Sequence, residues 1–206
     1  MGRRGLVDGT NLTFDPPQEG APAHIDRGQV REWSGPGPFV ARSQDAQHPF
    51  YIATYMTGAN PFASSWPWHF DGQGDPEWVN VIPPAQYLES YTLFADPTYP
   101  FTWLVVVRRQ VEGESPADVT LDCLGPIGGW SAFGGYEFAD VALETGKFVD
   151  VGECSTGVHS LKSARPFGVT VWGWGSPLTD PPTGYVSYAY LGGASVRPIN
   201  QVEIPR

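Results

Sequence analysis

Proline and glycine interrupt this sequence so often that they decide which regular structures it can form. The 206-residue chain contains 25 Gly and 21 Pro. No window longer than about ten residues keeps the apolar spacing of an amphipathic helix. Helices are therefore excluded as the main element, and short strands joined by turns remain. Aromatic residues, 14% of the chain, are frequent enough to give such strands a core.

Alternation of apolar and polar residues locates the expected strands, because successive side chains of a strand point to opposite faces. A single helical turn is expected within Pro83–Tyr91, where proline stands in the first turn. The sequence therefore predicts an all-β fold, an antiparallel β-sandwich. The expected strands are Asn11–Phe14, Gln29–Trp33, Phe39–Ser43, Phe50–Met56, Val79–Ile82, Tyr91–Ala95, Trp103–Arg109, Val119–Leu121, Glu137–Leu143, Gly157–Ser163, Val169–Trp174 and Val186–Leu191.

Two segments, Gly37–Gly58 and Gly157–Gly175, share one order of features. Each has a short strand that ends in Ser, a polar turn, Pro-Phe, and an alternating strand that ends in Gly. Both predict a β-hairpin whose second strand opens with proline, which is tolerated there because it has no N–H to donate to the ladder. The alternative is the general likeness of all hairpins.

The domain organisation follows from how that likeness is interpreted. One interpretation is a single compact β-module over residues 1–206. A true duplication would instead give two similar, closely packed β-lobes, residues 5–82 and 91–196, joined at residues 83–90.

Charge and hydropathy exclude several classes of protein. The formal net charge is −10 and only 17% of residues are charged, so no Lys/Arg stripe is available for nucleic acid, and the composition is not that of a disordered chain. No apolar run approaches the roughly 18 residues of a transmembrane helix. "MGRRGLVDGT" has a basic start without an apolar stretch behind it. We therefore expect a secreted or cell-surface protein whose signal peptide is not in this chain.

The only two cysteines are Cys123 in "VTLDCLG" and Cys154 in "VGECSTG". We predict that they form a disulfide, which implies an oxidising compartment. It would close a loop of about 30 residues and stabilise the fold by about 3–4 kcal/mol. Two separate buried thiols are the alternative. No histidine lies at zinc-ligand spacing from either cysteine.

Catalytic and cofactor motifs are not found in the sequence. The four histidines are scattered, and no nucleophile or phosphate-loop motif is present, so we expect no enzymatic activity and no cofactor. Asp71, Asp75 and Glu77 in "DGQGDPEW" are weak candidates for a Ca²⁺ site. The same three carboxylates are the densest acidic set for a less favoured function, a glycan-processing enzyme.

Tryptophans occur in two closely spaced pairs. Trp172 and Trp174 share one face of a strand, and Tyr188 and Tyr190 share one face of the next. If these strands pair, the two aromatic ridges can lie opposite each other. We favour packing of both ridges in the core, and a solvent-exposed platform is the alternative.

The preferred contact residues lie elsewhere. Trp66 and Trp68 fall in a proline-interrupted loop, "SSWPWHF", and with Tyr55 they are the candidate ligand-binding residues.

Several segments, in order across nearly the whole chain, resemble the N-terminal domain family of the IgGFc-binding protein. They are "VDGTNLTFDP", "GPFVARSQDAQHPFYIATYMTG", "GDPEWVNVIPPAQYLESYTLFADPTYPFTWLVVV", "TGVHSLKSARPFGVTVWGWG" and "SYAY". The resemblance implies a secreted β-rich module, used for binding or adhesion inside a larger protein, with no known enzymatic activity. It places no catalytic or ligand-binding residue on this chain. The composition suggests a bacterial member.

The expected function is therefore adhesion to or recognition of an extracellular protein or glycan, by aromatic stacking and hydrogen bonding. Other domains of the parent protein are expected partners. A structural spacer without its own ligand is the alternative, and it would bury its aromatic ridges against neighbouring modules.

Overall fold

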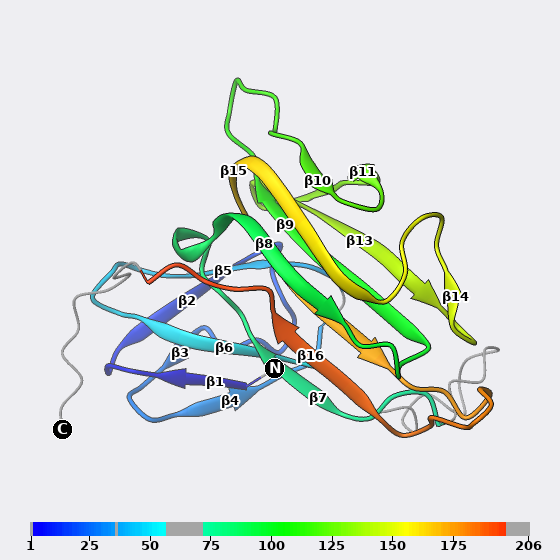
Figure 1. Cartoon of the computed structure of the whole chain (residues 1–206). Helices are drawn as coiled ribbons and strands as arrows, with labels where there is room; N and C mark the ends of the chain where they lie inside the picture. The colour runs from blue at the N-terminus through cyan, green and yellow to red at the C-terminus, as the bar shows by residue number, and fades with distance from the viewer. Residues whose placement is uncertain (1, 36, 57–71, 197–206) are drawn as a thin grey trace.

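The computed structural model describes residues 2–35, 37–56 and 72–196, and it is built almost wholly of antiparallel strands (Figure 1). This confirms the predicted all-β fold. The expected helical turn is present as one short 3-10 helix, η2 (Pro84–Gln86). None of the described segments forms a helix with the length and apolar character needed to cross a membrane.

The N-terminal part of the chain forms two small sheets, blue to teal in Figure 1. The four-stranded sheet has the order β4 (Val30–Glu32), β1 (Gly2–Gly5), β6 (Phe50–Met56) and β7 (Glu77–Asn80). The three-stranded sheet has the order β3 (His24–Ile25), β2 (Thr10–Asp15) and β5 (Val40–Ser43). The rings of Phe14, Trp33 and Phe39 pack together with centroids 5.7, 5.9 and 5.8 Å apart.

The rest of the described chain forms a nine-stranded sheet. Its main path is β11 (Gly125–Pro126), β10 (Val119–Leu121), β15 (Gly157–Trp174), β9 (Phe101–Arg109), β13 (Tyr136–Thr145) and β12 (Ser131–Phe133). Three more strands branch from this path: β14 (Val149–Asp150) pairs with β13, and β8 (Leu88–Ala95) and β16 (Ser187–Leu191) pair with β15.

Strand β15 gives this sheet its curl, and Figure 1 shows it running to the upper left and then turning back as its colour changes from yellow to orange. Its first part, to about Lys162, lies between β8 and β10, and its second part, from Phe167, lies between β9 and β16. The register with β8 shifts between Lys162 and Phe167. Because a bulge bends a strand and increases its twist, β15 folds the sheet over on itself and encloses a core.

The core contains the inward residues of both parts of β15 together with those of its neighbours. Because the inward positions alternate along each strand, the buried pattern has a period of two. The buried members are Tyr91, Leu93, Ala95, Leu104, Val106, Val119, Leu121, Ile127, Ala139, Val141, Leu143, Cys154, Leu161, Phe167, Val169 and Val171.

The two predicted hairpins are wrong. In the first segment β5 pairs with β2, whereas β6 pairs with β1 and β7. The second segment is the single strand β15. Its Pro166 falls where the register shifts, so the missing N–H breaks no ladder bond and the strand continues through it. The division into lobes 5–82 and 91–196 stays a prediction.

The aromatic ridges pair as strands but lie on opposite faces. In the observed register Tyr188 lies opposite Gly173 and Tyr190 opposite Val171, so both tyrosines point toward the core. Trp172 and Trp174 point away from it and are half-buried, and Trp174 stacks on Phe101 with ring centroids 5.4 Å apart. The favoured prediction that the two tryptophans are core residues is therefore wrong.

The inward tyrosines reach the free edge of β8. The hydroxyl of Tyr190 donates to the carbonyl of Phe94 at 2.6 Å and accepts from the N–H of the same residue at 2.8 Å. The hydroxyl of Tyr188 accepts from the N–H of Asp96 at 3.1 Å. Side-chain hydroxyls thus replace backbone pairing between β16 and β8.

Gly173 makes room for this contact. A methyl group at this position would overlap the Tyr188 ring. We expect Gly173→Ala to lower the free energy of unfolding by about 1–3 kcal/mol, as overpacking does, measured by urea denaturation.

The matched control is Gly128→Ala, at an exposed glycine with open space around the added methyl group. In the background of Tyr188→Ala the cost of Gly173→Ala should fall to that of the control. An undiminished cost in that background would contradict the assignment.

Candidate functional site

Three exposed aromatic side chains lie together on the outer surface of the four-stranded sheet. Tyr51 and Tyr55 are four residues apart on β6 and so share a face, and Trp78 on β7 lies directly opposite Tyr55. Their exposed fractions are 40%, 48% and 52%. We call Tyr51, Tyr55 and Trp78 the aromatic face.

Smaller residues of the same strands complete this surface. Ala53 lies between the two tyrosines and is buried. Its partner on the neighbouring strand β7 is Asn80. The Asn80 Oδ1 atom is buried and has no hydrogen-bond partner among the described residues. The face therefore combines flat apolar rings with phenol groups.

Tyr51 is a neutral hydrogen-bonding group of this face. Burial raises the pKa of Tyr51 above its ordinary value of 10.0, and the neighbouring Tyr55 raises it further. The Tyr51 hydroxyl therefore keeps its proton at neutral pH, and it can both donate and accept a hydrogen bond.

Of the predicted ligand-binding residues, the structure describes only Tyr55, which is exposed as part of the aromatic face. Trp66 and Trp68 lie outside the described residues. Tyr51 and Trp78 were not predicted from the sequence. The spacing of Tyr51 from Tyr55 in a period-two strand could have revealed the first, but Trp78 required the register of β6 with β7.

The candidate calcium ligands are only partly described. Asp71 lies outside the described residues. Asp75 is exposed, and its backbone N–H donates to Ser187 Oγ at 2.8 Å. One carboxylate oxygen of Glu77 accepts from the N–H of Trp78 at 2.8 Å. Calcium binding at these residues stays a prediction.

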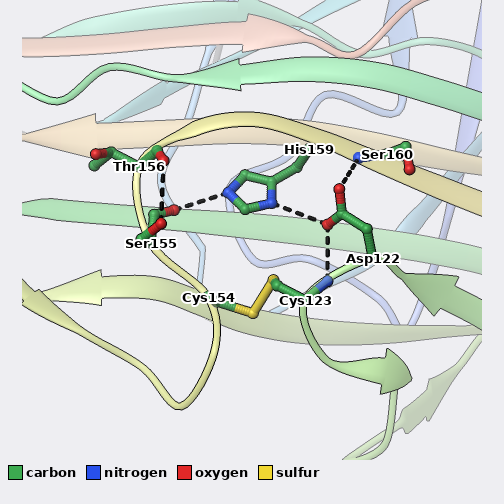
Figure 2. Close-up of a disulfide and its surroundings, with 7 residues drawn as sticks. All are labelled: Asp122, Cys123, Cys154, Ser155, Thr156, His159 and Ser160. Atoms are coloured by element: carbon green, nitrogen blue, oxygen red, sulfur yellow. Dashed lines mark hydrogen bonds and ion pairs between the residues drawn. A yellow bond between two sulfur atoms is a disulfide. The ribbon is translucent and has the colours of Figure 1, made fainter.

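A second site surrounds the two cysteines, which form the predicted disulfide (Figure 2). Cys123 follows β10, and Cys154 belongs to the turn before β15. The bridge spans 31 positions of the sequence, and Cys154 is 1% exposed. It therefore ties the start of β15 to the end of β10.

A buried histidine lies beside this bridge (Figure 2). His159 Nδ1 is 2.9 Å from Asp122 Oδ1, and Nε2 is 2.8 Å from the carbonyl oxygen of Ser155. A carbonyl and an ionised carboxylate can only accept, so the doubly protonated imidazolium satisfies both partners. Figure 2 shows the ring held between them, with the sulfur atoms below.

Asp122 is held by further donors. Its Oδ2 accepts from the N–H of Ser160 at 2.9 Å, and its Oδ1 accepts from the N–H of Cys123 at 2.8 Å. Burial alone would raise the pKa of Asp122, but the hydrogen bonds from His159 and these two N–H groups outweigh it and lower the pKa.

An acidic groove lies beside the C-terminal end of β9. Gln110, Val111, Glu112, Glu114, Pro116, Gly135 and Glu137 line it. Glu137 is paired with Arg108 at 2.7 Å, and Arg108 also lies 3.9 Å from the centre of the Trp130 ring. Glu114 is paired with Arg165. Ion pairs therefore occupy two of the three carboxylates; one joins β9 to β13, and the other joins the loop after β9 to β15.

The all-β fold and the disulfide fit a β-module of the extracellular kind. The family model described as IgGFc binding protein matches residues 5–173, most of the chain. The chain belongs to this family, as the resemblance predicted, and the family suggests a binding module with a protein partner outside the cell. No curated protein and no solved structure matches the chain.

The lowered pKa of Asp122 makes acid stability testable. A carboxyl group whose pKa is lower in the folded state stabilises the fold above its unfolded pKa, and it loses that effect as pH falls through the folded value. We expect the wild type to lose more stability than Asp122→Asn between about pH 5 and about pH 3, measured by urea denaturation at each pH.

Asp118→Asn, at an exposed carboxyl just before the same strand, is the matched control and should follow the wild type. Equal acid sensitivity of Asp122→Asn and wild type would show that the Asp122 network contributes nothing.

Proposed function

We propose that this chain is a non-catalytic recognition module of a larger secreted or surface protein, and that the aromatic face binds an extracellular protein or glycan. The observation that carries the proposal is the pair Tyr55 and Trp78. They lie directly opposite each other on neighbouring strands and expose about half of their surface.

Exposed pairs of this kind suit recognition for a physical reason. Tyrosine and tryptophan offer large rigid surfaces with a polar end, and they are enriched among the residues that dominate binding energy. A pleated sheet holds the rings in fixed positions, so little conformational entropy is lost when a partner binds. The tyrosine hydroxyl groups add hydrogen-bonding capacity.

The net charge of the chain favours a partner that is not strongly acidic. The chain carries a net charge of −10, so a strongly acidic partner would be repelled over most of the surface. Neutral sugars and protein surfaces with a neutral or basic patch remain suitable.

One observation favours the second candidate, a structural spacer. Phe94 on β8 and Val158 on β15 lie directly opposite each other and are 50% and 68% exposed. This pair is on the nine-stranded sheet, away from the aromatic face. A neighbouring module of the same parent protein would bury it if the chain served mainly to space other domains.

Binding to a panel of immobilised mucin glycans and immunoglobulin Fc tests the first proposal. We expect saturable binding of the oxidised wild-type chain. Tyr55→Ala/Trp78→Ala should lose about 2 kcal/mol or more, roughly a thirtyfold weaker Kd, measured by surface plasmon resonance.

Phe94→Ala is the matched control, because it removes an equally exposed ring from another sheet. A second variant, Trp66→Ala/Trp68→Ala, tests the loop residues predicted from the sequence, and a calcium chelator tests Asp71, Asp75 and Glu77. If all folded forms bind equally, or none binds at high micromolar concentration, the aromatic face is not the recognition site and the spacer is favoured.

A further inference from the structure

Four side chains with metal-binding atoms meet at the disulfide. Among the described residues, the one group of three metal-ligating side chains found close together is Asp122, Cys123 and His159, whose ligand atoms lie within 4.8 Å of one another. Cys154 adds the second sulfur, and the Cα atoms of the two cysteines are 4.9 Å apart. Two sulfur atoms, an imidazole and a carboxylate are a complete set of ligands for tetrahedral zinc.

We propose that the reduced form of this chain binds Zn²⁺ between the thiolates of Cys123 and Cys154, Nδ1 of His159 and Oδ1 of Asp122. The disulfide and the metal then exclude each other, because the sulfur atoms of a disulfide offer no thiolate. The newly made chain carries the same two thiols before its disulfide forms.

The distances require only small movements of the ligand atoms. Zinc bonds of about 2.0–2.3 Å place tetrahedral ligand atoms about 3.3–3.8 Å apart. The ligand atoms of Asp122, Cys123 and His159 already lie within 4.8 Å of one another, and the Cys154 sulfur is bonded to that of Cys123. Opening the S–S bond moves the two sulfur atoms apart toward this spacing, so the four atoms can close around one ion.

His159 is already oriented for this role. Its Nε2 lies 2.8 Å from the Ser155 carbonyl, which can only accept a hydrogen bond. Metal-bound histidines typically donate their second N–H to such a carbonyl or to a carboxylate. Nδ1 is thereby left facing Asp122, and a metal ion would replace the proton that Nδ1 and Oδ1 now share.

The Asp122 carboxylate is also oriented by a hydrogen bond, which its second oxygen accepts. Its Oδ2 accepts from the Ser160 N–H at 2.9 Å, so Oδ1 points to the metal position. His159 and Cys154 are almost wholly buried, whereas the Asp122 side chain is 39% exposed. The site is thus buried at His159 and Cys154 and open beside Asp122, where an ion can enter.

The redox step balances with a trialkylphosphine. The phosphine supplies two electrons to the S–S bond and becomes a phosphine oxide with the oxygen of one water molecule. The two hydrogen atoms of that water end on the two sulfur atoms. Binding of Zn²⁺ then releases both thiol protons, and the Nδ1 proton, to solvent. Thiolate and imidazole ligands select zinc rather than calcium.

Cobalt substitution tests the site in the full chain. The phosphine-reduced protein is titrated with Co²⁺ without oxygen, and tetrahedral d–d bands with thiolate charge-transfer absorption are expected at one ion per chain. Zn²⁺ should remove them. Oxidised protein and Cys123→Ser/Cys154→Ser should show neither band.

His159→Gln and Asp122→Asn separate this site from binding by two thiols alone. Each should weaken cobalt binding about tenfold or more, since even outer partners of metal ligands act on that scale. His48→Gln is the matched control, because His48 forms a similar pair with Asp45 at 2.6 Å in another part of the molecule.

Near-ultraviolet circular dichroism reports whether the reduced chain is folded. Absence of tetrahedral bands, or equal binding by the wild type and His159→Gln in a folded or an unfolded chain, would overturn the proposal. Tetrahedral bands that require Cys123, Cys154, His159 and Asp122 would establish it.

Discussion

The backbone pairing of β15 is the interaction on which the rest of this structure depends. One strand of 18 residues pairs with β8, β9, β10 and β16. At its turning point, the Tyr91 hydroxyl donates to the carbonyl of Phe167, and the two rings meet with centroids 4.9 Å apart. The bend in this strand therefore determines where the core residues of its two parts lie. The disulfide holds the beginning of the strand in place.

Local patterns in the sequence identified most strands, because side-chain alternation depends only on neighbouring residues. Phe50–Met56 and Val119–Leu121 were predicted with their observed bounds. Pairing between distant strands could not be predicted, since register is set by contacts far apart in the sequence. For this reason Trp78 was missed as the partner of Tyr55, and His159 as the partner of Asp122, 37 positions away. Pro166 likewise led to the wrong prediction of a hairpin. The strand continues through this proline because the register with β8 shifts there, and that shift cannot be read from the sequence.

The candidate recognition surface and the disulfide network belong to separate parts of the fold. The aromatic face is carried by β6 and β7, whereas Asp122, His159 and the cysteines lie on β10, β15 and the turns beside them. The two sheets meet where β7 runs beside β16 (Figure 1). The disulfide and the aromatic face are thus linked through β15, β16 and β7 rather than by direct contact.

The tyrosine hydroxyls on the edge of β8 affect whether this edge can pair with a strand of another molecule. An open strand edge is a template for pairing with another chain, and natural proteins block such edges. Here one phenol group of Tyr190 occupies both the N–H and the carbonyl of Phe94. The last residues of this exposed edge are thus blocked against pairing with a strand of another molecule.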